Sequence, residues 1–392
     1  MAEVIKIVLT GGPCAGKTTA MDFLKRELEK LNIKVFVLQE TASKLMRKGI
    51  TPQKLGVYEF HKKLFETQLA EENMLEERAV GYEGERTVIL FDRGLLDSKA
   101  YVTDEEFERY ISLSNKNEDL LRNSYDAVFH LKSVALSDES VYMQNKNSIR
   151  KEDIDLAKAL DEKILSIWTG TSHLRVIAND KDFNKKLENL LKEVTGFIGI
   201  PEPLEIERKF LIEYPDINFL ENMTTCRKVP ITQAYLNTPE EGMFRIRKRG
   251  QGKDAVYIKT VKIKINDLKR IEKETYLSEL EYNNYLSKKD YITGIISKDR
   301  YCIVYNDEYF ELDVYHNTLS DIDKILEEYK PKNVVVILFD GMGSRLIKKI
   351  ELLSEDQPYE LPPFVKLIRE VSYEPEYRNV ALAQRYVSFN NI

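Results

Sequence analysis

Two groups of residues on this chain have the types and the spacing needed to bind phosphate groups. The first lies near the N-terminus, where residues 11–18 read Gly-Gly-Pro-Cys-Ala-Gly-Lys-Thr and fit the pattern G-x-x-x-x-G-K-[ST]. The second begins just past the midpoint, where Glu205, Glu207 and Lys209 are followed by further charged residues spaced two apart. The first pattern indicates a loop that holds phosphates with backbone amides, and the second indicates a strand-rich unit with a charged interior.

The glycine-rich pattern assigns a physical task to each of its residues. Gly11 and Gly16 permit backbone angles and close approaches that a Cβ would obstruct. The loop amides and the start of the following helix point toward bound phosphate. Lys17 brings a charge to the β and γ phosphates, and the Thr18 hydroxyl can bind Mg²⁺ or Mn²⁺. We therefore predict that ATP or GTP is bound by Gly11, Gly12, Pro13, Cys14, Ala15, Gly16, Lys17, Thr18 and Thr19.

Four more polar residues in the first half are expected near this loop. Asp92 directly follows an apolar run, and it could bind the metal through water or act as a catalytic base toward an acceptor hydroxyl. Its alternative role is a helix cap. Arg93 could hold an acceptor or a phosphate, or form a surface ion pair. Glu40 is a candidate for binding an acceptor, and Arg150 has the position of an arginine that closes over bound phosphates.

The first 200 residues alternate between apolar runs and helical patterns, which predicts a parallel sheet covered by helices on both faces. Strands are expected at 4–9, 35–38, 87–91, 127–131 and 174–177, and helices at 19–31, 58–79, 151–168 and 183–197. Two prolines, Pro201 and Pro203, cannot continue the last helix and mark a boundary. We predict domains at 1–199 and 203–392, the second with many short strands and few helices.

Composition limits the class of protein. The 392 residues are enough for two cores, and the net charge of −6 gives no strong nucleic-acid signal. Cys14, Cys226 and Cys302 are far apart and odd in number, which indicates a reducing compartment and no disulfide framework. No signal peptide or transmembrane segment is evident, so a cytoplasmic protein is expected.

Charged residues in the second half recur at the spacing of strand faces. Side chains two apart on a strand share one face, and apolar residues such as Ile246 and Ile271 lie between the charged ones. The aligned sets are Glu205, Glu207 and Lys209; Arg245, Arg247 and Arg249; Arg270, Glu272 and Glu274; Lys298 and Arg300; and Glu311 and Asp313, with Lys259 on a strand of its own. Several such strands with mixed charge predict a mainly antiparallel β-barrel whose wet interior binds phosphates and metal.

Residues 1 to about 198 resemble the P-loop kinase-like domains of ribosylnicotinamide and nucleoside kinases. The stretch from Leu9 to Thr19 is most similar to the TRPL translocation defect family, in which such a domain precedes a barrel. The resemblance implies ATP or GTP binding and, for animal members of that family, binding of GTP and phosphatidic acid. Kinase activity does not follow from similarity of the loop alone.

Residues 203 to about 390 resemble the CYTH, or triphosphate tunnel, family, whose E-x-E-x-K signature matches at Glu205, Glu207 and Lys209. The resemblance implies hydrolysis of a triphosphate or pyrophosphate assisted by Mg²⁺ or Mn²⁺, with Lys209 neutralising charge near the bond that breaks. By the same resemblance the metal is held by Glu205, Glu207, Glu272, Glu274 and Glu351, and the triphosphate by Arg245, Arg247, Lys259, Arg270, Lys298 and Arg300. Lys349 departs from the family pattern, because a second metal carboxylate is expected there.

Two other functions remain open from the sequence. One is a regulatory protein in which nucleotide sets the conformation and the barrel binds a phosphorylated ligand or an anionic lipid headgroup without turnover. The other is a nucleoside or ribosylnicotinamide kinase with an accessory barrel. We further expect His61, His130 and His173 to be packing or surface residues, and the glutamate-rich stretch 66–77 to be a solvated helix face.

Overall fold

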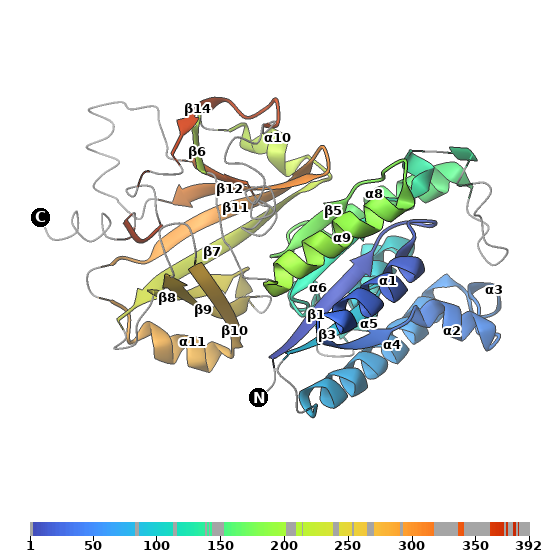
Figure 1. The fold of residues 1–392 in the computed structure, drawn as a ribbon. Helices are drawn as coiled ribbons and strands as arrows, with labels where there is room; N and C mark the ends of the chain where they lie inside the picture. The colour runs from blue at the N-terminus through green and yellow to red at the C-terminus, as the bar shows by residue number, and fades with distance from the viewer. Residues whose placement is uncertain are drawn as a thin grey trace, which may run out of the picture. The chain divides into compact units, whose positions relative to one another are not determined.

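The computed structural model describes two compact units, Met1–Ile198 and Gly199–Ile392, which are coloured blue to green and green to red in Figure 1. The residues described are 3–82, 86–112, 116–137, 139–140, 142, 153–200, 209–213, 215–237, 243–252, 255–264, 270–290, 293–316, 336–340, 361–371, 374, 379–381 and 383. Among these residues, no helix is both long and apolar enough to cross a membrane.

The first unit contains a parallel five-stranded sheet in the order β2-β3-β1-β4-β5. Its strands are β1 (Glu3–Thr10), β2 (Lys34–Leu38), β3 (Arg86–Asp92), β4 (Ala127–Leu131) and β5 (Leu174–Ile177). Its helices are α1 (Lys17–Lys30), α2 (Thr41–Arg47), α3 (Pro52–Leu55), α4 (Val57–Val80), α5 (Asp104–Ser112), α6 (Glu118–Arg122), α8 (Ile154–Trp168) and α9 (Phe183–Ile198), with the 3₁₀ turns η1 (Leu95–Tyr101) and η2 (Val134–Leu136). The predicted α/β class is confirmed.

The sequence pattern explains why these strands lie inside the unit. All residues of β4 and nearly all of β3 are buried, as continuous apolar runs covered on two faces require. The central strand is β1, which pairs with β3 on one side and with β4 on the other. The carboxyl ends of these three strands therefore meet at one edge of the sheet, where α/β proteins bind ligands.

One glutamate of α4 departs from the solvated face expected for residues 66–77. Glu72 is 3% exposed, and it accepts hydrogen bonds from the Tyr125 hydroxyl at 2.9 Å and from Gln68 at 2.8 Å. Burial raises the pKa of Glu72 to about 8, although both hydrogen bonds oppose this rise. The prediction of a solvated face is thus wrong at this residue, because Gln68 and Glu72, one helical turn apart, both lie on the buried side of α4.

The raised pKa of Glu72 predicts that the first unit loses stability as the pH rises. The folded state keeps the proton up to about pH 8, whereas the unfolded chain releases it near pH 4.5, so stability falls by up to about 1.4 kcal/mol per pH unit in this window. Glu72→Gln should flatten this slope. The slope is measured by urea unfolding at several pH values between 5 and 8, with the fluorescence emission of the buried Trp168 as the signal. Glu77→Gln, an exposed position of α4, is the control; equal slopes for all three proteins would contradict the prediction.

The second unit is built on one antiparallel sheet of nine strands in the order β10-β9-β8-β7-β11-β12-β13-β6-β14. The strands are β6 (Lys209–Ile212), β7 (Cys226–Leu236), β8 (Met243–Arg249), β9 (Val256–Lys264), β10 (Arg270–Leu277), β11 (Ile296–Tyr305), β12 (Glu308–His316), β13 (Val336–Asp340) and β14 (Leu367–Glu370). The helices described in this unit are α10 (Ile217–Glu221) and α11 (Glu279–Leu286). The predicted antiparallel class is confirmed, and the strand β13, at Val336–Asp340, lies between β12 and β6.

Two apolar clusters cover one face of this sheet. The first packs Phe210, Tyr301, Ile303, Phe310 and Leu312 together with Leu220 of α10. The second packs Phe244, Ile246 and Tyr257 with Tyr282 of α11. Since strand residues alternate between faces, these clusters leave the intervening charged residues on the other face of the sheet.

Candidate phosphate-binding sites

The glycine-rich loop joins the end of β1 to the start of α1. Gly11 has φ 133° and Gly16 has φ 86°, both in the region that favours glycine. A Cβ on Gly11 would collide with the carbonyl oxygen of Leu131 at the end of β4. Lys17 is the first residue of α1, and its buried ammonium donates to the carbonyls of Gly11 and Gly12, each at 2.8 Å. The loop therefore has the backbone conformation and the central cation that phosphate binding requires.

A buried carboxylate fixes the start of this loop. Asp161 of α8 accepts hydrogen bonds from the amides of Gly12 at 2.7 Å and Ser133 at 3.0 Å, and lies 3.1 Å from Nε2 of His130. Burial alone would raise the pKa of Asp161, but His130 and the two amides hold it below its usual range. His130 is fully buried, so it is a packing residue as predicted, although it also contacts a charged partner.

A lysine fixes the middle of the loop. The ammonium of Lys186, on α9, donates to the carbonyl of Ala15 at 3.1 Å, to that of Lys132 at 2.7 Å and to the side chain of Asn179 at 2.7 Å. Burial lowers the pKa of Lys186 to about 8, an effect that Asp161 opposes. Asp161 and Lys186 thus attach the loop to two helices that are distant in the sequence.

Asp92 lies where its predicted role requires. It ends β3 in register with Leu9 of β1, and its carboxylate accepts from the Thr18 hydroxyl at 3.4 Å. Carboxylate and hydroxyl oxygens are the hard donors that Mg²⁺ prefers, so Thr18 and Asp92 fit this metal. Both oxygens are at the edge of the sheet that carries the loop.

Arg93 is held behind Asp92 by two carboxylates. Its φ of 76° is in the left-handed region, and its Nε donates to Glu40 at 2.9 Å while a second nitrogen lies 3.5 Å from Asp97. Strained backbone of this kind at a sheet edge often accompanies function. The structure therefore brings Glu40, Asp92 and Arg93 together beside the loop, and the arginine is buried and paired, not on the surface.

In the second unit, strand register collects charged residues on the face that the apolar clusters leave uncovered. Arg249 pairs with Ile231, which pairs with Lys298, and Arg300 pairs with Asp313. Residues opposite each other in a sheet share a face, as do residues two apart. Of the residues whose side chains are described, this face carries Arg227, Arg245, Arg247, Arg249, Glu274, Lys298, Arg300, Glu311 and Asp313.

Asp313 is the centre of the most buried part of this face. It is fully buried and accepts from Lys298 at 2.5 Å and from Arg300 at 2.7 and 2.9 Å. Arg300 also pairs with Glu311. Burial would raise the pKa of Asp313, but Arg300 and Lys298 hold it below its usual range, so the carboxylate is charged.

The other predicted triphosphate ligands with described side chains divide between the two faces. Arg247 pairs with Glu274 and lies 3.3 Å from the Thr260 hydroxyl, on the charged face. Lys259 pairs in register with Ile246 and lies over the rings of Phe244 and Tyr285, at 5.5 and 4.9 Å. The structure therefore does not bring Lys259 together with Arg245 and Arg247, because it points to the face covered by α11.

Several predicted site residues lie outside the described part of the chain. These are Arg150, Glu205, Glu207 and Glu351, together with the side chains of Lys209, Arg270 and Glu272; Lys349, the departure from the family pattern, also lies outside it. Only their backbone register is known for three of them: Lys209 pairs with Phe339, and Glu272 with Lys262, while Arg270 begins β10 opposite Lys264. Within the described residues no group of three or more acidic, histidine or cysteine side chains could hold a metal ion.

Asp161, Lys186 and Asp313 are among the residues near these sites that the sequence did not assign, as are Asp97 and Arg227. Asp161 and Lys186 are charged residues within the otherwise apolar buried stripes of α8 and α9, which is the signal that could have identified them. Asp313 aligns with Glu311 in the sequence, but nothing there shows that it pairs with Lys298 and Arg300.

Comparison with known proteins matches the two halves of the chain to two different domain families. The AAA domain family matches residues 6–186, and the CYTH domain family matches residues 203–356. The chain thus carries an AAA domain of the P-loop kinase-like type followed by a CYTH domain. A solved structure described as "The crystal structure of the inorganic triphosphatase NE1496" is 26% identical over 46% of this chain and 97% of its own, with a TM-score of 0.28. No curated protein matches the chain.

Proposed function

We propose that this chain has two phosphate sites: the first domain binds ATP or GTP, and the second binds a triphosphate or pyrophosphate and hydrolyses it with Mg²⁺ or Mn²⁺. The observation that carries the proposal is the charged face of the second sheet. Its described side chains include Arg245, Arg247, Arg249, Lys298 and Arg300, against a smaller number of carboxylates. A surplus of cations on one face of a sheet suits a polyanion with several charges.

In the first site, loop amides and Lys17 would hold the phosphates. Lys17 donates to two loop carbonyls, so its ammonium is already placed inside the curve of the loop. Thr18 and Asp92 would hold Mg²⁺, which when bound neutralises charge on the phosphate oxygens. Arg93, oriented by Glu40 and Asp97, would contact the nucleotide or an acceptor. Arg150 would close over the bound phosphates.

In the second site, positioning and charge neutralisation would supply most of the catalysis. Arg245 and Arg247 would hold the phosphate chain together with Lys298, Arg300 and Arg270, and Lys209 would neutralise charge near the bond that breaks. Glu205, Glu207, Glu272, Glu274 and Glu351 would serve the metal. We leave Lys259 out of this set, since it lies on the other face of the sheet.

The finer identity of the family is also a proposal. The order of the two domains supports assignment to the TRPL translocation defect family, and with it the preference of some members for GTP. A binding role without turnover, in which the second site takes a phosphorylated ligand, remains the alternative if hydrolysis is absent.

One observation favours a second candidate function, acceptor-dependent phosphoryl transfer. Glu40 and Arg93 form a 2.9 Å ion pair beside Asp92, at the edge of the sheet that carries the loop. A carboxylate that can accept a hydroxyl proton next to a fixed arginine is the arrangement that such transfer needs. This function predicts consumption of ATP only when an acceptor is present.

The test is phosphate release from ATP, GTP, tripolyphosphate and pyrophosphate with Mg²⁺ or Mn²⁺. We expect Arg247→Ala to lower turnover by roughly tenfold or more, because a charge-assisted contact to phosphate is lost. Lys248→Ala is the matched control: it changes the next residue of β8, which points to the other face and lies over the Tyr257 ring. Lys17→Ala should leave this turnover unchanged.

Two outcomes would contradict the hydrolase. Equal losses in Arg247→Ala and Lys248→Ala would show that the charged face is not the site. No phosphate release from any substrate by the unaltered protein would leave the binding role or the acceptor-dependent kinase. A nucleotide-binding measurement and a screen for acceptors would then separate these two functions.

A further inference from the structure

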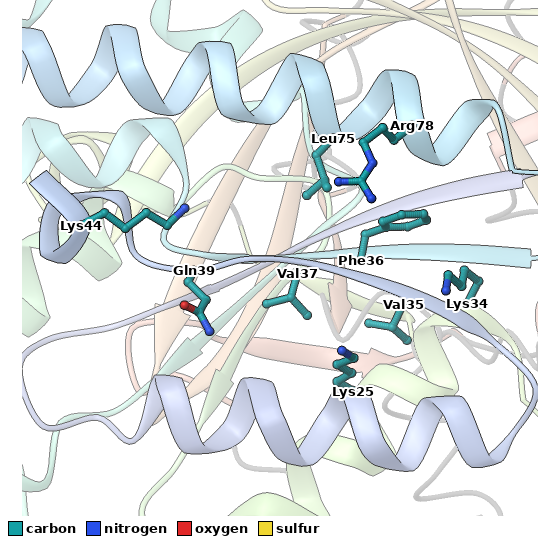
Figure 2. A pocket seen from close by; sticks show the side chains of 9 residues that line it. All are labelled: Lys25, Lys34, Val35, Phe36, Val37, Gln39, Lys44, Leu75 and Arg78. Carbon is teal, nitrogen blue, oxygen red and sulfur yellow. The ribbon is translucent and has the colours of Figure 1, made fainter.

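The strand at the edge of the first sheet borders a pocket that neither proposed phosphate site uses. The pocket has a volume of about 470 Å³, and four consecutive residues of β2, Lys34 to Val37, line it together with Gln39. Because neighbouring strand residues point to opposite faces, a pocket lined by consecutive residues must run along the edge of the strand. Figure 2 shows β2 crossing the pocket between two helices.

The backbone at this edge has no neighbouring strand in the described structure. β2 is the first strand in the order β2-β3-β1-β4-β5, and it pairs with β3 alone. An edge strand presents backbone donors and acceptors to which another extended segment can add. Its five residues correspond to about 16 Å of extended chain, which fixes the length of segment that would fit.

The side chains around the edge are cationic and apolar, and none that lines the pocket is acidic. Lys25 of α1, Lys44 of α2 and Arg78 of α4 approach it from three helices. Lys44 is paired with Glu71 at 3.1 Å, whereas Lys34 and Arg78 lie over the Phe36 ring at 5.6 and 5.7 Å. A cation that lies over an aromatic ring can still attract an acidic partner.

The two faces of β2 at this edge carry different side chains. Val35 and Val37 point toward α1, while Lys34 and Phe36 share the other side with Leu75 and Arg78 of α4 (Figure 2). An added strand with alternating acidic and apolar residues would place its carboxylates beside Lys34 and Arg78, and its apolar side chains beside the two valines.

We propose that β2 is the docking edge for an extended acidic segment of another protein, which adds to the sheet as a sixth strand. Backbone hydrogen bonds along β2 supply affinity, and Lys34 and Arg78 select acidic residues at alternate positions. The proposal is independent of the two phosphate sites, since none of its residues belongs to them.

The experiment uses the full chain and a labelled nine-residue peptide that alternates glutamate and valine, with binding followed by fluorescence anisotropy. Saturable binding is expected, and Lys34→Glu or Arg78→Glu should each weaken it roughly tenfold or more by reversing a charge next to the carboxylates. Lys63→Glu, an exposed position on the same helix as Arg78, is the control and should bind normally. Emission of the buried Trp168 shows that each variant is folded.

Two peptides methylated on alternate amide nitrogens separate strand addition from simple charge attraction. Successive amides of a strand point to opposite edges, so only one of the two sets can face β2. We expect one methylated peptide to lose binding and the other to keep it. Absence of saturable binding, equal binding of both methylated peptides, displacement by tripolyphosphate, or an equal loss in Lys63→Glu would each overturn the proposal.

Discussion

Asp313→Ala is expected to destabilise the second unit by about 3–5 kcal/mol, because it breaks a buried ion-pair cluster. Asp313 is fully buried and is shared by Lys298, which is 1% exposed, and by Arg300. Removing the carboxylate takes away the charge that Lys298 and Arg300 share inside the sheet, while Arg300 keeps its ion pair with Glu311. The loss greatly exceeds that of one hydrogen bond, because the desolvation of the buried cations is no longer offset by the Asp313 carboxylate.

The measurement is urea unfolding of the whole chain by circular dichroism, with Trp168 emission recorded in parallel. Trp168 is the single tryptophan and belongs to the first unit, so its transition is expected to stay in place while the other moves. Asp299→Ala is the matched control, because this β11 carboxylate pairs with the half-exposed Lys228 at 2.9 Å and should cost at most about 1 kcal/mol. Similar losses for the two variants would show that burial of the Asp313 cluster is not what stabilises the unit.

Lys17→Met should have the largest effect on nucleotide binding. A charge-assisted hydrogen bond contributes about 1.5–3 kcal/mol, which corresponds to a loss of roughly ten- to hundredfold in the affinity for ATP or GTP. Methionine keeps most of the length and apolar stem of the side chain, so the change is chiefly one of charge. The loop also loses two hydrogen bonds to the carbonyls of Gly11 and Gly12.

Titration calorimetry with ATP and GTP measures this loss, and Lys30→Met provides the control. Lys30 is the last residue of the same helix and is exposed, with Glu27 as its partner at 2.9 Å. Affinity retained in Lys17→Met would place the nucleotide somewhere other than the loop. If Lys17→Met loses both its affinity and the cooperative unfolding transition seen by Trp168 emission, the variant is misfolded. Lys17→Arg, which keeps the charge, then decides whether the charge is required for binding.

Much of the first domain could be predicted from the sequence, because its strands are continuous apolar runs and its long helices have a clear period. The five strands and α1, α4, α8 and α9 lie within a few residues of their expected positions. The short helices α2, α3, α5 and α6 were not predicted, since four to nine residues carry too little periodicity to stand out.

The candidate sites were predictable where a residue's position along the chain determines its place in space. Asp92 follows a strand next to β1, so the sheet order brings it to Thr18. The residues that hold the loop from afar were not predictable: Asp161 is 149 residues from Gly12, and only the packing of α8 against the loop brings them together. Lys259 was assigned to the wrong face of the sheet. Charge spacing shows which residues of β9 share a face, but not which of the two faces they share with Arg245 and Arg247 of β8.

The bond between Asp161 and the amide of Gly12 has a thermodynamic consequence. The amide belongs to the loop that is expected to contact phosphate, while the carboxylate belongs to α8, which begins at Ile154. A phosphate that competes for this amide and a displacement of α8 therefore act on one shared equilibrium. Linkage makes the effect reciprocal: any partner that shifts α8 changes nucleotide affinity by the same factor by which nucleotide changes the affinity for that partner.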